Sequence, residues 1–288
     1  MKNINRRAFI SKAAMGAGAL ALTQIPGGML NAARAVDMPV GFQTFPVRDK
    51  MGKDLTGTLK GMADLGYTYC EMCYPADYAA IGYGFMKDMK PADIKKTIED
   101  CGLKCISSHF GKASLTADKV DTAIEWAHAM GLTQMICSTF WLPKTATLKD
   151  YYDDCDRLNK GAAKIKAAGM HAGFHNHDME FHELEGKLIY DELMSHFDPD
   201  LVKMQFQTEV IVLGYKAADY FKKYPGRFIS SHLSDWTADK KEVPIGSGVI
   251  DWKEFFKAAK KGGVKNIFVE EEANPENMKN SVSYIKSL

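Results

Sequence analysis

The sequence lacks an excess of charge of either sign. Its 288 residues include 37 Lys and Arg against 36 Asp and Glu, which gives a formal net charge of +1. Because no basic cluster stands out, the composition argues against a nucleic-acid partner. After residue 35 there is no apolar run long enough to cross a bilayer, so we expect no stable membrane span in that part. Internal repeats, low-complexity segments and linkers are also missing there, which favours a single domain over 36–288.

The cysteines do not form a pattern typical of a zinc or redox centre. Cys70 and Cys73 form one CxxC motif among six cysteines, and no second pair accompanies it. Cys70, Cys105 and Cys137 fall inside apolar runs, where a free thiol acts as a small hydrophobic side chain. Although an exported protein could oxidise its cysteines, we expect buried free thiols here.

The first 35 residues have the composition of a secretory signal. Arg6 and Arg7 precede a stretch of Ala, Gly and Leu that is too short and too weakly apolar to span a bilayer stably. The sequence Ala-Arg-Ala at 33–35 supplies a small-x-small cleavage site. The arginine pair is similar to a twin-arginine signal, and an ordinary secretory signal with two arginines is the alternative. We predict cleavage after Ala35 and a periplasmic or otherwise exported location.

Short apolar runs alternate with longer amphipathic segments along the rest of the chain. The expected strands are Val40–Phe45, Tyr67–Cys73, Leu103–His109, Gln134–Thr139, His171–His177, Val202–Gln207, Phe228–Ser234 and Asn266–Glu271. The expected helices are Asp54–Leu65, Pro91–Cys101, Ala117–Met130, Leu148–Ala168, Ile189–His196, Ala217–Tyr224, Asp251–Lys261 and Pro275–Ser287. Strict alternation of this kind predicts an α/β fold with a parallel sheet. Because the chain after residue 35 is close to the ~250 residues of one (β/α)8 TIM barrel, we expect a closed barrel.

In such a barrel the active site lies at the C-terminal ends of the strands. Polar residues lie at or close to the end of every expected strand, whereas most of the strands start with an apolar residue. The residues to which we assign substrate binding are Gln43, Arg48, Glu71, Trp141, Asp235 and Trp236. The two tryptophans could stack on a sugar ring, and a place in the core is an equal alternative.

The densest group of potential ligands lies in Met170–Phe181, which reads MHAGFHNHDMEF. Its first half alternates with period two, as strands do. Side chains suited to a divalent cation are His175, His177, Glu180, His232 and Glu270. Imidazole together with carboxylate suits Zn, Mn, Co or Fe better than Ca. Such an ion would polarise a sugar carbonyl or hydroxyl, and a neighbouring carboxylate or imidazole could move a proton on carbon.

Several motifs together resemble one known family. They are GFQTFPVRD at the first strand, HNHDMEF at the fifth, YPGRFISSHLSDW leading into the seventh, IGSGVIDW before the last helical unit and IFVEEE at the eighth. In order and spacing they are similar to the xylose isomerase-like TIM barrels known as sugar phosphate isomerases/epimerases. The resemblance covers essentially the whole chain after residue 35, and it is specific for the superfamily but not for a substrate.

The resemblance implies one divalent metal ion (Mn, Zn, Co or Mg), held by Glu, Asp, His and Glu at the ends of strands five to eight. The corresponding positions here are His175, Gln207, His232 and Glu270, with Glu180 near the first of them. Two positions depart from the family pattern, since His175 replaces Glu and Gln207 replaces Asp. Gln can coordinate through its carbonyl oxygen, but it is neutral and binds more weakly.

The resemblance also implies a metal-dependent sugar isomerase or epimerase that moves a proton next to a sugar carbonyl. The general base would be Glu270, His177 or His109, and the substrate would be a small carbohydrate. That carbohydrate need not be a phosphate, since the sequence has no Gly-rich phosphate cradle. The same proton abstraction on a 3-keto-glycoside would expel the aglycone, so a lyase or hydrolase is the first alternative. A non-catalytic sugar-binding barrel is the second, and the oligomeric state stays open.

Overall fold

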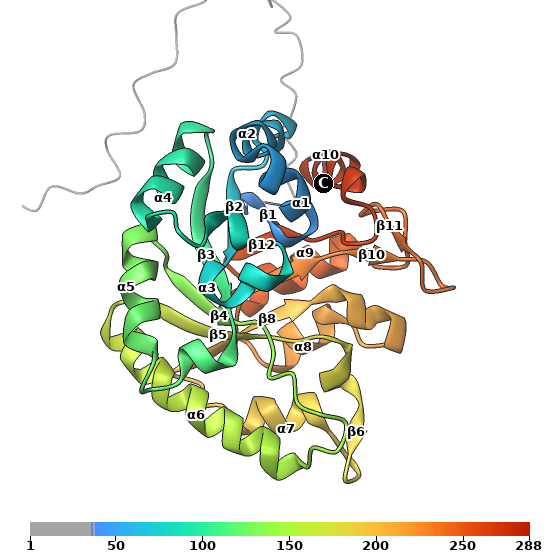
Figure 1. The fold of residues 1–288 in the computed structure, drawn as a ribbon. Helices are drawn as coiled ribbons and strands as arrows, with labels where there is room; N and C mark the ends of the chain where they lie inside the picture. Colours follow the sequence, from blue (N-terminus) through green and yellow to red (C-terminus); the bar gives the residue numbers. More distant parts are fainter. Residues whose placement is uncertain (1–35, 37) are drawn as a thin grey trace, which may run out of the picture. The chain divides into compact units, whose positions relative to one another are not determined.

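The chain folds into a closed barrel of eight parallel strands surrounded by helices (Figure 1). The computed structural model describes residue 36 and residues 38–288, so the expected signal at 1–35 lies outside the described residues. The strand order around the barrel is β1-β12-β9-β8-β5-β4-β3-β2. The last strand pairs with the first in parallel, with Val40 opposite Ile267, and this pairing closes the sheet. The expected (β/α)8 fold is confirmed.

The barrel strands agree closely with the expected ones. They are β1 (Val40–Gln43), β2 (Tyr69–Cys73), β3 (Lys104–Phe110), β4 (Gln134–Cys137), β5 (His171–His175), β8 (Val202–Gln207), β9 (Phe228–Leu233) and β12 (Asn266–Val269). Several of them end one or two residues earlier than the sequence suggested. The residues just beyond these ends leave the sheet and are free to form the mouth of the barrel.

The main helices also lie where the alternating pattern placed them. They are α2 (Leu55–Leu65), α4 (Pro91–Asp100), α5 (Val120–Met130), α6 (Leu148–Ala167), α7 (Ile189–His196), α8 (Ala217–Lys223), α9 (Trp252–Gly262) and α10 (Met278–Ser287). Two short helices, α1 (Arg48–Lys53) and α3 (Pro75–Tyr78), were not expected, because they are too short to show a helical period. In Figure 1 the C-terminal α10 lies beside α2, near the start of the barrel.

Helix α9 illustrates why these segments form helices. The Asp251 side chain accepts a hydrogen bond from the backbone N–H of Glu254 and so caps the N-terminus. Phe255 and Phe256 are buried against the barrel. At the other end Gly263 adopts a left-handed conformation with φ +87°, which ends the helix at little steric cost.

Two short hairpins extend from the barrel ends. They are formed by β6 (Glu183–Leu184) with β7 (Lys187–Leu188), and by β10 (Asp235–Trp236) with β11 (Glu242–Val243). The sequence did not predict them, because two-residue strands show no periodicity. All six cysteines are free and buried, as expected. Within the described part of the chain, no helix combines the length and the apolar character needed to cross a membrane.

Candidate active site

A cavity of about 630 Å³ opens at the C-terminal ends of the strands, where the site of a TIM barrel is expected. Side chains from several strand ends and the loops after them surround it. Of the residues given a role from the sequence, the cavity is lined by His109, Trp141, His175, His177, Gln207, Trp236 and Glu270. The barrel thus brings together residues that are up to 161 positions apart in the chain.

Three imidazoles pack against one another beside this cavity. His109 is the last residue but one of β3, His175 ends β5 and His232 lies in β9, and all three are buried. The His109 and His232 rings are stacked with centroids 5.0 Å apart, and the His175 ring lies 4.4 Å from that of His232. One nitrogen from each ring lies within 4.8 Å of the others. This cluster could hold a metal ion, and His109 in it was assigned a catalytic role rather than a metal-binding one.

His232 lies between two carboxylates. Its Nδ1 is 2.7 Å from Oε2 of Glu270, and its Nε2 contacts Oε2 of Glu71. Burial opposes a charge on this ring, but Glu270 and Glu71 outweigh burial and raise the pKa of His232 to about 10. Burial likewise opposes the charge on Glu71, yet the imidazoles of His109 and His232 hold the pKa of Glu71 well below its usual range. The three groups form a carboxylate–imidazolium–carboxylate arrangement.

Glu71 is the centre of a polar network inside the barrel. It accepts hydrogen bonds from Nε2 of Gln43 at 2.9 Å, from the hydroxyl of Ser107 and from Nε2 of Gln205 at 2.8 Å. Gln205 also bonds to Nε2 of His109 through Oε1, at 2.7 Å. Gln43 and Glu71 were assigned to substrate binding, but both are 0% exposed. The structure gives these two side chains a supporting position beneath the imidazoles instead of a place in the cavity.

Gln207 occupies the strand position where the family pattern has an Asp. Its Nε2 donates to Oε2 of Glu270 at 2.8 Å, while its buried Oε1 has no hydrogen-bond partner among the described residues. The buried Nδ1 of His175 likewise has no hydrogen-bond partner among the described residues. Buried polar atoms without partners are rare and point to a missing ligand. The buried imidazoles of His109, His175 and His232 lie close enough together to hold a metal ion, and imidazole suits a divalent transition metal.

His177 follows β5 and lines the cavity. Burial is the main cause that lowers the pKa of His177 to about 4, so its ring is neutral near pH 7. Its buried Nδ1 lacks a hydrogen-bond partner within the described structure. The ring lies 5.4 Å from that of Trp141 and 4.9 Å from that of His175. A neutral imidazole that lines the cavity can accept a proton, and its lowered pKa makes it a weak base.

Both tryptophans assigned to substrate binding lie at the mouth of the cavity. Trp141 is 65% exposed and has φ +46°, a backbone conformation that costs energy for a residue other than Gly. Trp236 donates from Nε1 to the Ser234 hydroxyl at 3.0 Å, which fixes its indole. An exposed aromatic ring held in a strained conformation is typical of a ligand-binding platform.

Glu180 was expected to be a metal ligand, and the structure places its carboxylate in a turn. It lies in the 3-10 helix η5 (Asp178–Phe181), where it accepts hydrogen bonds from the Thr139 hydroxyl at 3.0 Å and from the backbone N–H of His177 at 2.7 Å. Burial raises the pKa of Glu180 to about 7. In this position Glu180 orients the backbone that carries His177.

Arg48 and Asp235, also assigned to substrate binding, have partners within the protein. The Arg48 guanidinium donates to the Phe45 carbonyl at 2.6 Å and lies 3.9 Å from the centre of the Phe45 ring. Asp235 is 0% exposed and accepts hydrogen bonds from backbone N–H groups and from Nε1 of Trp252 at 2.8 Å. Asp235 thus holds the IGSGVIDW segment in place.

The sequence gave little indication of other residues at the site. Gln205 joins His109 to Glu71, and its one signal was a polar side chain inside an apolar strand with the same parity as Gln207. Glu242 lines the cavity from the short strand β11, and Glu272 lines it from the loop after β12. Because a loop carboxylate is usually solvated, neither could be singled out from the sequence.

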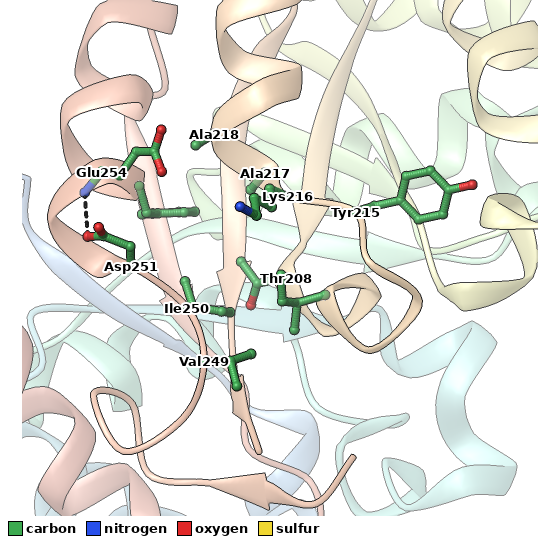
Figure 2. Close-up of a pocket in the computed structure, with 11 residues that line it drawn as sticks. Thr208, Tyr215, Lys216, Ala217, Ala218, Val249, Ile250, Asp251 and Glu254 are labelled. Carbon is green, nitrogen blue, oxygen red and sulfur yellow. Dashed lines mark hydrogen bonds between the residues drawn. The ribbon is translucent and has the colours of Figure 1, made fainter. Parts of the chain in front are cut away.

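A second, smaller cavity of about 80 Å³ lies between the 3-10 helix η6 (Thr208–Leu213), α8 and the start of α9. Figure 2 shows its lining, which includes Tyr215, Val249 and Ile250. The Asp251 cap to Glu254 is drawn there as a dashed line. Its described lining contains no imidazole.

Solved structures of similar proteins share this fold. A sugar phosphate isomerase/epimerase from Parabacteroides distasonis ATCC 8503 has a TM-score of 0.76 at 21% identity, over 88% of this chain and 97% of that one. A second protein of the same description and organism has a TM-score of 0.72 at 24% identity, over 85% and 96%. A structure described as IOLI protein with a binding zinc atom has a TM-score of 0.63 at 14% identity, over 87% and 94%. A search of curated proteins returned no match.

The sequence also matches a family model over most of its length. Residues 59–288 match the model described as xylose isomerase-like TIM barrel. This range includes the strands from β2 to β12 and all of the histidines of the site. The chain therefore belongs to the xylose isomerase-like TIM barrel family.

Proposed function

We propose that this chain is a carbohydrate-converting enzyme of the isomerase/epimerase type that works with one divalent metal ion. The observation that carries the proposal is the convergence of His175, His232 and Glu270, from three strands, beside one cavity. Two unpartnered buried atoms, Nδ1 of His175 and Oε1 of Gln207, support a ligand at this place. The family membership supports sugar chemistry.

His175, Gln207, His232 and Glu270 would hold the metal ion. When bound, the ion would polarise a carbonyl or hydroxyl oxygen of the sugar. Its identity is open among Mn, Zn, Co and Mg, and one structurally similar protein is described with zinc. The three imidazoles of His109, His175 and His232 form an alternative donor set that shares two members with the first.

Among the three candidate bases, His177 has the arrangement best suited to proton transfer. Its ring lines the cavity and is neutral near pH 7. Glu270 is already bonded to His232 and Gln207, and Nε2 of His109 is bonded to Gln205. His177 would take a proton from a carbon next to the sugar carbonyl, and the aromatic mouth would limit access of water. Glu270 and His109 would then hold and orient the other groups.

A second candidate is a lyase or hydrolase acting on a 3-keto-glycoside at the same site. The observation that favours it is the size of the cavity, since about 630 Å³ leaves room beyond one sugar ring. Phe45, Tyr78 and Ile81 line part of that space and could contact an apolar leaving group. The proton abstraction would be the same, and the bond to the leaving group would break in the next step.

The experiment that tests the proposal combines metal analysis with turnover. Purified protein should contain close to one equivalent of a divalent metal, and Glu270→Gln should lose both metal and turnover. Incubation with free ketoses and with 3-keto-glycosides divides the isomerase from the lyase. Metal-free protein that binds sugar without converting it would contradict both and favour a sugar-binding barrel.

We also propose that residues 1–35 are a twin-arginine-type signal cleaved after Ala35, and that 36–288 is an exported catalytic domain. The support is the composition of the segment, with Arg6 and Arg7 before a short Ala- and Gly-rich stretch. Mass spectrometry of the exported protein should give an N-terminus at Val36. Replacing Arg6 and Arg7 by Lys should leave the uncleaved protein inside the cell, and unchanged export would favour an ordinary secretory signal.

A further inference from the structure

The charged side chains that line the large cavity have a strong excess of one sign. The carboxylate residues among them are Asp77, Asp178, Glu209, Glu242, Glu270 and Glu272. Among the described residues that line it there is neither Lys nor Arg. Arg48 is the nearby cation that faces Glu272, but its guanidinium is bonded to the Phe45 carbonyl and stacked on the Phe45 ring.

One of these carboxylates occupies a group of backbone N–H donors. After β12 the backbone N–H groups of Glu272, Ala273 and Asn274 point at Glu242, with N···O distances of 3.1, 3.1 and 3.4 Å. Successive backbone N–H groups that converge in this way form an anion-binding nest. Glu242 itself lies in β11, a different segment from the loop after β12 that supplies the N–H groups.

The location of this nest is important because it follows the eighth strand of the barrel. In TIM-barrel enzymes a phosphate group of the substrate is frequently bound by the loops after the last two strands. Here Glu242, Glu270, Glu272 and Ala273 all line the same cavity. A phosphorylated sugar bound in that cavity would therefore meet a nest already filled by a carboxylate of the chain.

We propose that Glu242 blocks the nest after β12 and makes the site selective for uncharged carbohydrates over sugar phosphates. This inference rests on the proposed function insofar as the substrate is a carbohydrate. An uncharged ring would contact Trp141 and Trp236 through its apolar face and the imidazoles through its hydroxyls. A phosphate group would have to displace Glu242 and approach Glu209, Glu270 and Glu272 without a basic partner.

The test uses inorganic phosphate as the probe, so it does not depend on the identity of the sugar. Glu242→Ala empties the nest and should bind phosphate at least about tenfold more tightly than the wild type, because one negative charge at contact distance is removed. Binding is followed by isothermal titration and by the rise in Tm with phosphate. The rise in Tm compares each protein with and without phosphate, so it remains informative if the variant is less stable than the wild type.

Two further variants separate the nest from the general charge of the mouth. Glu242→Gln keeps an oxygen in the nest and should gain much less phosphate affinity than Glu242→Ala. Glu272→Gln removes a charge without opening the nest and should behave like the wild type. Equal phosphate affinity in the wild type and Glu242→Ala would overturn the proposal, as would an equal gain in all three variants.

A panel of aldoses and ketoses with their phosphate esters tests the selectivity directly. The wild type should bind the free sugar more tightly than its ester in each pair, and Glu242→Ala should narrow the difference. Tighter binding of an ester by the wild type would refute the proposal while leaving the enzymatic function intact. Loss of all turnover with unchanged phosphate results would instead count against the proposed function alone.

Discussion

Nδ1 of His232 lies 2.7 Å from Oε2 of Glu270, and this contact joins β9 to β12 beside the cavity. The opposite nitrogen of the ring contacts Glu71, which is 0% exposed and comes from β2. One carboxylate therefore lies at the cavity and the other beneath it. The orientation of the imidazole depends on Glu71, although Glu71 has no access to a substrate. Under the proposed function His232 ligates the metal ion, and a carboxylate in the position of Glu71 would fix the tautomer and the angle of that histidine.

We expect Glu71→Gln to reduce kcat by about 10–100-fold, the usual range for loss of an outer partner of a ligating histidine, while KM changes little. The amide keeps the size of the side chain but removes the charge that holds Nε2 of His232. Steady-state kinetics and metal content measure the effect. The matched control is Ser107→Ala, which removes a different hydrogen bond to Glu71 and keeps its charge. If the two variants behave alike, the charge of Glu71 has no special role.

Asp235 should contribute to the stability of the fold through its hydrogen bonds. Its carboxylate accepts hydrogen bonds from the backbone N–H groups of Gly246 and Gly248 and from the indole of Trp252, at 2.9, 3.0 and 2.8 Å. Asp235→Ala leaves these donors without a partner in a buried place, so the free energy of unfolding should fall by about 2–4 kcal/mol. Urea denaturation measures the change. Asp235→Asn keeps one oxygen acceptor and should lose less, and a neutral effect of Ala would contradict the structural role.

Variants of Trp141 can distinguish the energetic cost of its backbone conformation from the contribution of its ring to substrate binding. Its left-handed conformation costs about 1 kcal/mol, and Gly at this position removes that cost while adding freedom to the unfolded chain. Because these two effects offset each other, Trp141→Gly should change Tm very little. Loss of the exposed ring should raise KM by about 3–10-fold, the value of one aromatic contact. Trp141→Ala keeps the backbone conformation and also removes the ring, so it should raise KM as much as Trp141→Gly does; an unchanged KM in both variants would show that the ring does not contact the substrate.

The sequence was sufficient for the barrel because its strands and helices are set by local patterns. Runs such as Val202–Gln207 alternate apolar and polar residues over a strand length, and Asp54 or Gly263 marks a helix end. The positions of His175 and His232 at strand ends followed from the same patterns. These signals act over a few residues, and the structure contains the strands and helix ends that they predicted.

The sequence was not sufficient to separate residues that touch the cavity from those that support it. Gln43 and Glu71 lie at strand ends as His109 does, yet they point to the inside of the barrel. Small register shifts between β2 and β3 and between β8 and β9 alter which side chains meet, and no local pattern encodes them. The partners of Glu242 are also out of reach of local patterns, because the nest after β12 lies about thirty residues away from Glu242 along the chain.

The buried carboxyl of Glu271 should make the free energy of unfolding depend on pH. Its Oε1 accepts a hydrogen bond from Ser281 at 2.8 Å, while its Oε2 is buried without a partner among the described residues. Burial raises the pKa of Glu271 from its usual 4.5 to about 7. The folded state thus binds this proton more tightly than the unfolded state. The stabilising contribution is complete below pH 4.5 and is lost as the pH rises through 7.

We expect Glu271→Gln to remove the loss of stability that accompanies ionisation of Glu271 as the pH rises. The amide keeps an acceptor for Ser281 and is neutral at every pH, so the variant should be more stable than the wild type at pH 8 by up to about 3 kcal/mol. At pH 4 the two proteins should have nearly equal free energies of unfolding. Other buried carboxyls such as Glu180 titrate in the same range, so the difference between variant and wild type across pH 4–8 is the quantity to measure by urea denaturation. A difference that does not change with pH would show that Glu271 has the same pKa in the folded and the unfolded protein.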